Sequence, residues 1–123
     1  MILVDTSVWI DYFKGIETQE TNLLDTVLSN DSVVIGDLIL LEILQGFRSD
    51  KDYETAKEHL QELPQFSMLS PEIAINAAEN YRVLRKRGIT IRKTADVIIA
   101  TFCINKSIPL LFADKDFIPF TKH

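Results

Sequence analysis

Four acidic residues interrupt or flank the apolar runs of this chain. They are Asp5, Glu42, Asp96 and Asp114. Charged side chains are almost never fully buried unless they are paired or bind a metal ion. No basic residue lies beside three of these acids in the sequence. Carboxylates at the margins of a core, without sequence neighbours to neutralise them, predict a site for a divalent cation.

Each acid also has a simpler structural explanation. Asp5 could cap a helix that begins near residue 7, and Asp96 could complement the dipole in the first turn of its own helix. Asp114 and Asp116 could form an ordinary acidic turn. Glu42 has no such explanation, because apolar residues flank it on both sides and an unpaired buried carboxylate is costly. One metal site accounts for all the acids better than several coincidences do.

The available ligand types favour an oxygen-only site. His59 lies in a strongly polar helical stretch and His123 is the last residue, so neither is expected to be a ligand or a general base. Without a histidine and cysteine ligand set, zinc is disfavoured, and Mg²⁺ or Mn²⁺ is expected. Asp37 is expected to cap a helix, and Asp11 to lie on the outer face of another. The four glycines are too scattered for a phosphate-binding loop.

Length and composition predict one soluble domain spanning residues 1–123. The apolar fraction is 46%, which is typical of a globular protein, and the chain can bury a core without disulfides. The single cysteine, Cys103, cannot form an intrachain disulfide and suits a reducing compartment. We expect no secretory leader and no membrane span, and therefore a cytoplasmic location.

The basic residues are concentrated in one part of an acidic chain. The net charge is −5, which alone argues weakly against nucleic-acid binding. Six of the 13 basic residues nevertheless lie between positions 82 and 93: Arg82, Arg85, Lys86, Arg87, Arg92 and Lys93. This basic segment could simply be a solvated helix face. It gains functional interest because it leads directly to Asp96.

Short apolar runs alternate with longer helical patterns along the chain. Strands are expected at 2–4, 33–35, 66–69 and 110–112, and helices at 7–14, 19–29, 37–47, 50–63, 71–87 and 94–106, with Ser70 and Thr94 as caps and a turn or short helix at 114–117. This alternation predicts an α/β fold with a parallel sheet. Ligands of such sheets bind at the carboxyl ends of the strands, where Asp5 and Asp114 both fall. If their strands are neighbours, the two acids share one edge.

Four segments in this order resemble the motifs of PIN-domain ribonucleases, specifically the VapC toxins of bacterial and archaeal toxin–antitoxin pairs. They are ILVDTSVWID at 2–11, EILQG at 42–46, IRKTADVIIA at 91–100 and LLFADKDF at 110–117. The resemblance covers essentially the whole chain. It implies a PIN-like α/β fold, with a central parallel sheet of four to five strands flanked by helices.

The resemblance also implies roles for individual residues. Asp5, Glu42, Asp96 and Asp114 would be the catalytic, metal-binding acids, with Asp116 as an auxiliary ligand. Thr6 would lie beside the site through its hydroxyl group. Arg92 would hold a phosphate, and Lys93 and Arg85 would follow the RNA backbone. Phe112 departs from the threonine that is common at this position, a change that would remove a hydroxyl group without touching a ligand.

The activity implied is endonucleolytic hydrolysis of RNA, with transfer or ribosomal RNA as the expected target. A water activated by one or two Mg²⁺ or Mn²⁺ ions would attack the phosphate. A principal ion held by Asp5, Glu42 and Asp96 is expected, with Asp114 completing the cluster. The partners implied are an antitoxin protein that covers the site and a second copy of the chain in a homodimer.

Two other functions remain open from the sequence. An aspartate-based phosphoryl-transfer protein, such as a receiver domain or a phosphatase, would also place acids at strand ends. The phosphatase form is disfavoured because Asp5-Thr6-Ser7 lacks a second aspartate two positions on. A non-catalytic PIN scaffold that binds RNA or a partner protein is the third possibility, and the presence of all four acids argues against it.

Overall fold

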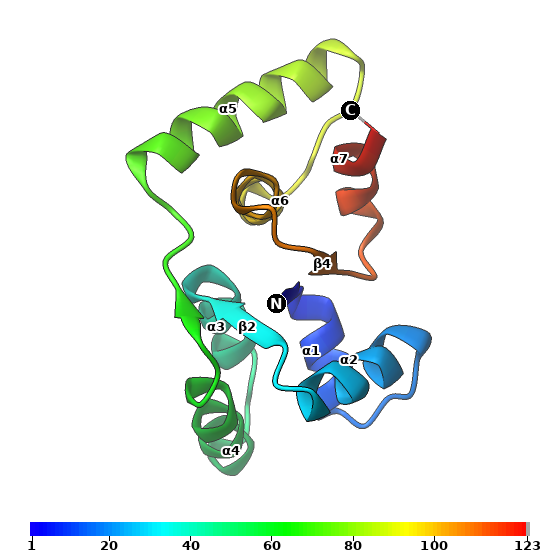
Figure 1. The fold of residues 1–123 in the computed structure, drawn as a ribbon, viewed down its shortest axis with the longest axis vertical. Helices are drawn as coiled ribbons and strands as arrows, with labels where there is room; N and C mark the ends of the chain where they lie inside the picture. Colours follow the sequence, from blue (N-terminus) through cyan, green and yellow to red (C-terminus); the bar gives the residue numbers. More distant parts are fainter. Residues whose placement is uncertain (123) are drawn as a thin grey trace.

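A parallel sheet forms the centre of the structure, a computed structural model that describes residues 1–122 (Figure 1). Within these residues the sheet has four strands, β1 (Ile2–Val4), β2 (Val33–Gly36), β3 (Gln65–Phe66) and β4 (Leu110–Leu111). The strand order is β3-β2-β1-β4, so β1 pairs with β2 on one side and with β4 on the other. The predicted parallel sheet is confirmed, and the strands that precede Asp5 and Asp114 are neighbours.

Helices connect the strands and cover the sheet. They are α1 (Thr6–Phe13), α2 (Gln19–Ser29), α3 (Asp37–Gln45), α4 (Asp50–Gln61), α5 (Pro71–Lys86), α6 (Thr94–Lys106), the 3₁₀ helix η1 (Lys115–Phe117) and α7 (Ile118–Lys122). Figure 1 shows α5, α6 and α7 at the top of the view and α2 and α4 at the bottom, with the strands between them. None of the helices in the described residues is long and apolar enough to cross a membrane.

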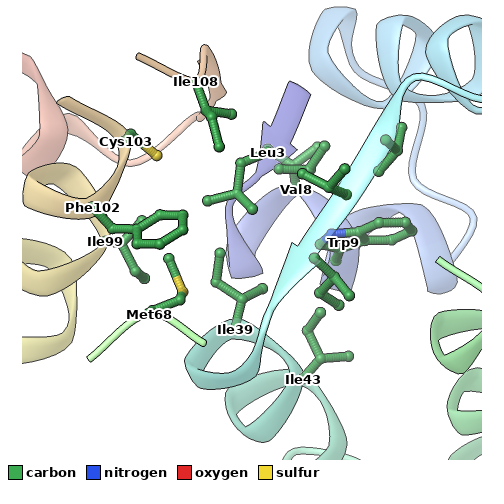
Figure 2. Packing of buried hydrophobic residues seen from close by; sticks show 14 of the residues in the cluster. Leu3, Val8, Trp9, Ile39, Ile43, Met68, Ile99, Phe102, Cys103 and Ile108 are labelled. Carbon is green, nitrogen blue, oxygen red and sulfur yellow. The ribbon is translucent and has the colours of Figure 1, made fainter. Parts of the chain in front are cut away.

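The core fills the space between the sheet and the helices α1, α3 and α6. Leu3 of β1 is fully buried, as are Ile39 of α3 and Ile99 of α6, and Phe102 and Met68 pack beside them (Figure 2). Leu3, Ile39 and Ile99 belong to the apolar runs that the acids flank or interrupt. Burial of these apolar runs therefore determines the positions of the acids next to them.

Several boundaries differ from the sequence-based expectation. Strand β3 ends at Phe66 and not at residue 69, because the backbone N–H of Met68 donates to the Asp37 carboxylate at 3.0 Å and leaves the sheet. Asp37 is therefore not the cap of α3: Gly36 holds that position, and Asp37 is the first helical residue. Thr94 is likewise the first residue of α6, after Lys93. Ser70 caps α5 as predicted, because its hydroxyl oxygen accepts the backbone N–H of Ile73.

The carboxyl-terminal segment also differs from the sequence-based expectation. Helix α7 was not predicted, because residues 118–122 are too few for a helical period and include a proline. The expectation about His123 concerns a residue that lies outside the described part of the chain.

Candidate metal centre

Asp5, the first of the candidate acids along the chain, lies at the carboxyl end of β1. Its backbone N–H donates to the Leu111 carbonyl at 2.9 Å, which joins it to the end of β4. Its carboxylate accepts from the Ser7 hydroxyl at 2.9 Å and caps α1, so the structural role considered for Asp5 is real. The residue is only 4% exposed. Burial raises the pKa of Asp5, the bonds from Ser7 and the Thr6 backbone oppose this, and the charge of Glu42 adds to the rise.

Glu42 approaches the same region from α3, which follows β2 directly. The Thr6 hydroxyl donates to Oε1 of Glu42 at 2.9 Å, a bond between residues 36 positions apart. Thr6 is the residue that follows Asp5, so this bond ties α3 to the carboxyl end of β1. Thr6 therefore lies beside Glu42, one of the acids that the sequence predicts for the site.

Asp96 is the most buried acid of the group together with Asp5, at 4% exposed, and it lies in the first turn of α6. Its Oδ2 atom is buried and has no hydrogen-bond partner. Burial raises the pKa of Asp96 to about 6, and the charges of Asp5, Asp114 and Glu42 add to the rise, while Lys93 opposes it. The negative charges of Asp5, Asp114 and Glu42 therefore all act on the Asp96 carboxylate.

Asp114 and Asp116 complete the group from the segment after β4. Asp114 caps η1 by accepting the Asp116 backbone N–H at 2.9 Å. One carboxylate oxygen from each of Asp96, Asp114 and Asp116 lies within 4.8 Å of the others. This closest trio contains Asp116, which the sequence ranked as an auxiliary, whereas Asp5 and Glu42 lie beside it.

Two basic side chains lie at the rim of the acidic group. Arg92 Nη2 is 3.6 Å from Asp116 Oδ2, and Lys93 Nζ is 3.9 Å from Asp114 Oδ2. Both cations are well exposed, at 80% and 61%, and exposed pairs of this length contribute at most about 1 kcal/mol. Among the side chains that the structure describes, no ion pair joins a lysine or an arginine to Asp5, Glu42 or Asp96. The centre is therefore strongly negative.

The donor set fits a hard divalent cation. All five side chains offer carboxylate oxygens. The Asp96 Oδ2 atom is buried without a hydrogen bond, and Asp116 Oδ2, also without a hydrogen bond, has the Arg92 guanidinium at 3.6 Å. An unsatisfied buried acceptor is costly, and a cation ligated by oxygen removes that cost. Cys103 does not supply a soft ligand, because burial raises the pKa of its thiol to about 12. The residues thus suit Mg²⁺ or Mn²⁺ better than zinc.

The remaining expected residues lie farther out. Arg85 of α5 does not join the acidic group; its guanidinium packs over the Tyr81 ring, 5.6 Å from the ring centre. Phe112 packs on Phe117 at 5.5 Å between ring centres and lines an apolar cavity. Ser7 was missed by the sequence reading. Its position two residues after Asp5, where a helix begins, is the signal that could have identified it.

Comparison with known proteins agrees with this geometry. The family model of the PIN domain matches residues 2–121. The chain belongs to the PIN-domain family. Ribonuclease VapC11 of Mycobacterium tuberculosis is 30% identical over 119 residues, which are 95% of this chain and 89% of that protein. Ribonuclease VapC1 of Methanocaldococcus jannaschii is 35% identical over 114 residues, 93% of this chain and 76% of that protein. Within the family, this PIN domain therefore groups with the VapC ribonucleases.

Solved structures confirm the fold of this PIN domain. VapBC2 from Rickettsia felis, bound to a DNA fragment from its promoter, contains a chain that superposes with a TM-score of 0.77 and 19% identity, covering 97% of this chain and 92% of the other. FitAcB from Neisseria gonorrhoeae gives a TM-score of 0.74 at 19% identity, covering 98% and 94%. At these identities the likeness supports the PIN fold alone.

Proposed function

We propose that this PIN domain is the endoribonuclease toxin of a VapC-type toxin–antitoxin pair. The membership of the family and the likeness to named VapC ribonucleases support an RNA-cleaving hydrolase. The observation that carries the catalytic part is Asp96, a buried carboxylate with an unpartnered oxygen, surrounded by further acids from three other segments. An unpaired buried carboxylate surrounded by other acids lowers the stability of the fold, which favours a functional role for it.

Five acids are proposed to hold Mg²⁺ or Mn²⁺. Asp96, Asp114 and Asp116 form the closest trio, and Asp5 and Glu42 extend the group on the side of β1 and α3. A bound ion there supplies an activated water and offsets the charge that develops on the phosphate. The retained acids make a non-catalytic PIN scaffold the weaker alternative, and the family assignment leaves no support for a receiver domain or phosphatase.

The chain's own side chains position the acids and the substrate. The Thr6 hydroxyl orients Glu42, and the Ser7 hydroxyl orients Asp5, so both carboxylates are held before the substrate arrives. Arg92 and Lys93 lie at the rim and are exposed, and we assign them to backbone phosphates of the RNA. Arg85 is assigned to phosphates farther along the strand.

The partners follow from the same proposal. The Rickettsia felis and Neisseria gonorrhoeae neighbours belong to VapBC and Fit assemblies, and a further neighbour is a toxin–antitoxin complex from Klebsiella pneumoniae. We propose that a cognate antitoxin covers the acidic centre of this chain, that the toxin is a cytoplasmic homodimer, and that its substrate is a transfer or ribosomal RNA.

The chemistry of the product ends tests the proposal. Purified protein with Mg²⁺ or Mn²⁺ should cut RNA to leave a 5′ phosphate, and chelation with EDTA should stop the reaction. Because a water is the nucleophile, a substrate with deoxyribose at the cut position should still be cut. Products with a 2′,3′-cyclic phosphate, or full activity in the Asp96→Asn variant, would contradict the proposed mechanism.

A further inference from the structure

A cavity of about 490 Å³ lies between α5 and α6, on the far side of α6 from the metal centre. Helix α5 packs on α6 (Figure 1). The α6 side of the cavity is formed by Thr94, Val97 and Ile98, which share one face of the helix. Asp96 is rotated by about 200° from Thr94 around the same helix. The first turn of α6 therefore separates the cavity from the acids.

Apolar and aromatic side chains form the inner surface of this cavity. Ala77 and Val97 are buried, and Ile98 is half-buried. Ala78 is exposed on α5, and its small side chain leaves the space above it open. Tyr81 lines the cavity as well and is half-buried. Proteins that bind unpaired RNA bases place them on apolar and aromatic side chains of this kind.

The outer edge of the cavity is positively charged. Arg82 and Arg85 lie about one turn apart on α5, and both are exposed. The Arg85 guanidinium packs over the ring of Tyr81, 5.6 Å from its centre. Of the described residues that line the cavity, none is acidic. An apolar interior with two arginines at its edge matches a nucleotide, whose base has apolar faces and whose phosphate is an anion.

Two hydroxyl groups at the cavity are available to read a base. They belong to Tyr81 and Thr94. In the described part of the chain, neither hydroxyl is hydrogen-bonded to another protein group. A hydroxyl group both donates and accepts hydrogen bonds, and sequence-specific RNA recognition depends on such bonds to the edges of unstacked bases. The cavity therefore has the means to distinguish one base from another.

We propose that this cavity binds one unpaired base of the RNA substrate and thereby selects the site of cleavage. The base would lie against Val97 and Tyr81, with its phosphates facing Arg82 and Arg85. The inference rests on the proposed function, which supplies the RNA. A helix with its side chains is about 10 to 12 Å across, so a few nucleotides of one strand span the distance from the cavity to the acids.

The segment before α6 supports this path for the strand. Arg92 and Lys93 directly precede Thr94 and lie at the rim of the metal centre. They continue the positive charge of Arg82 and Arg85 toward the acids. A strand with a base in the cavity would thus meet basic side chains along its way to the metal ion.

Binding of RNA with and without bases tests the proposal. The probes are 5′-labelled single-stranded hexaribonucleotides of adenine, cytosine or uracil, and an abasic hexamer with the same phosphates. Binding is measured by fluorescence anisotropy in EDTA, which prevents cleavage. The wild type should bind its preferred hexamer more tightly than the abasic hexamer by roughly five- to a hundredfold. Basic side chains alone would bind all four probes equally, because the probes carry the same backbone charge.

Substitutions locate the bound base. Ala78→Leu fills the cavity without a change of charge and should remove most of the preference for base-bearing RNA. Val83→Leu is the matched control, because Val83 is exposed on the same helix and lies outside this cavity. Arg82→Gln should weaken the binding of all four probes and lower the salt dependence of log Kd by about 0.7. Thr94→Val should reduce the differences among the three base-bearing hexamers.

Three results would overturn the base-binding proposal. They are equal binding of the abasic and base-bearing hexamers, equal preference in Ala78→Leu and Val83→Leu, or loss of a dimer in Ala78→Leu with its base preference intact. The last result, measured by sedimentation velocity, would assign the cavity to a second copy of the chain. A protein that prefers base-bearing RNA but never cleaves it would refute only the proposed activity. A protein that cleaves RNA without this preference would refute only the base-binding cavity.

Discussion

Asp96→Asn keeps the shape of the most constrained side chain in the metal centre and removes its charge. The pKa of Asp96 rises from 3.8 to about 6 on folding, mainly through burial and then through the charges of Asp5 and Asp114. At 1.36 kcal/mol for each pKa unit, ionisation of Asp96 costs the metal-free fold up to about 3 kcal/mol. Solvent at the rim and the nearby Lys93 screen part of this cost. We therefore expect the variant to be more stable than the wild type by roughly 1 to 3 kcal/mol without metal at pH 7.5.

The direction of the pH dependence follows from the same pKa. A group whose pKa is higher in the folded state stabilises the fold through its bound proton. For Asp96 this contribution is complete below about pH 3.8 and is lost as the pH rises through about 6. The stability difference between Asp96→Asn and the wild type should therefore be largest above pH 7. It should shrink as the pH falls toward 5.

The assay is urea unfolding in EDTA at several pH values, together with thermal melts. The expected gain corresponds to a melting temperature higher by roughly 3 to 10 °C. Glu79→Gln, a charge removal at an exposed position of α5, is the control and should change little. Millimolar Mn²⁺ or Mg²⁺ should raise the melting temperature of the wild type and have a much smaller effect on Asp96→Asn. A variant no more stable than the wild type, or a gain that does not depend on pH, would refute the reasoning.

Three further substitutions test separate parts of the structure. Thr6→Val removes the hydroxyl that donates to Glu42 and should lower kcat about ten- to a hundredfold with little change in folding, measured by steady-state cleavage; unchanged kcat would exclude a role for this bond. Gly36→Ala would drive a methyl group into the buried Met68 side chain and should cost about 1 to 3 kcal/mol in urea unfolding; a neutral result would mean that Met68 adapts freely. Arg92→Ala should weaken RNA binding and reduce the salt dependence of log Kd by about one; an unchanged salt slope would remove Arg92 from the phosphate contacts.

Much of the site follows from the sequence because parallel strands present their carboxyl ends at one edge. Asp5 follows β1 directly and Asp114 follows β4 closely, and the two strands are neighbours, so their acids are brought to the same edge. Glu42 could be proposed from the sequence because no structural role explained a carboxylate within an apolar helix. Ile39 and Ile43 of α3 are buried, and the half-buried Glu42 accepts the Thr6 hydroxyl at the carboxyl end of β1. These features are local and depend on short stretches of chain.

The parts that the sequence could not supply depend on contacts between distant segments. The trio includes Asp116, whose backbone N–H donates to the Asp114 carboxylate, so both acids of η1 lie close to Asp96 of α6. The early end of β3 depends on a bond between Asp37 and Met68, 31 positions apart.

Anomalous diffraction from crystals grown with Mn²⁺ tests most directly whether the acids form one metal centre. The account predicts a strong manganese peak within about 2.5 Å of carboxylate oxygens from Asp96 and its acidic neighbours, and the loss of that peak in Asp96→Asn. A peak elsewhere on the molecule, or none at a manganese concentration that supports cleavage, would contradict it.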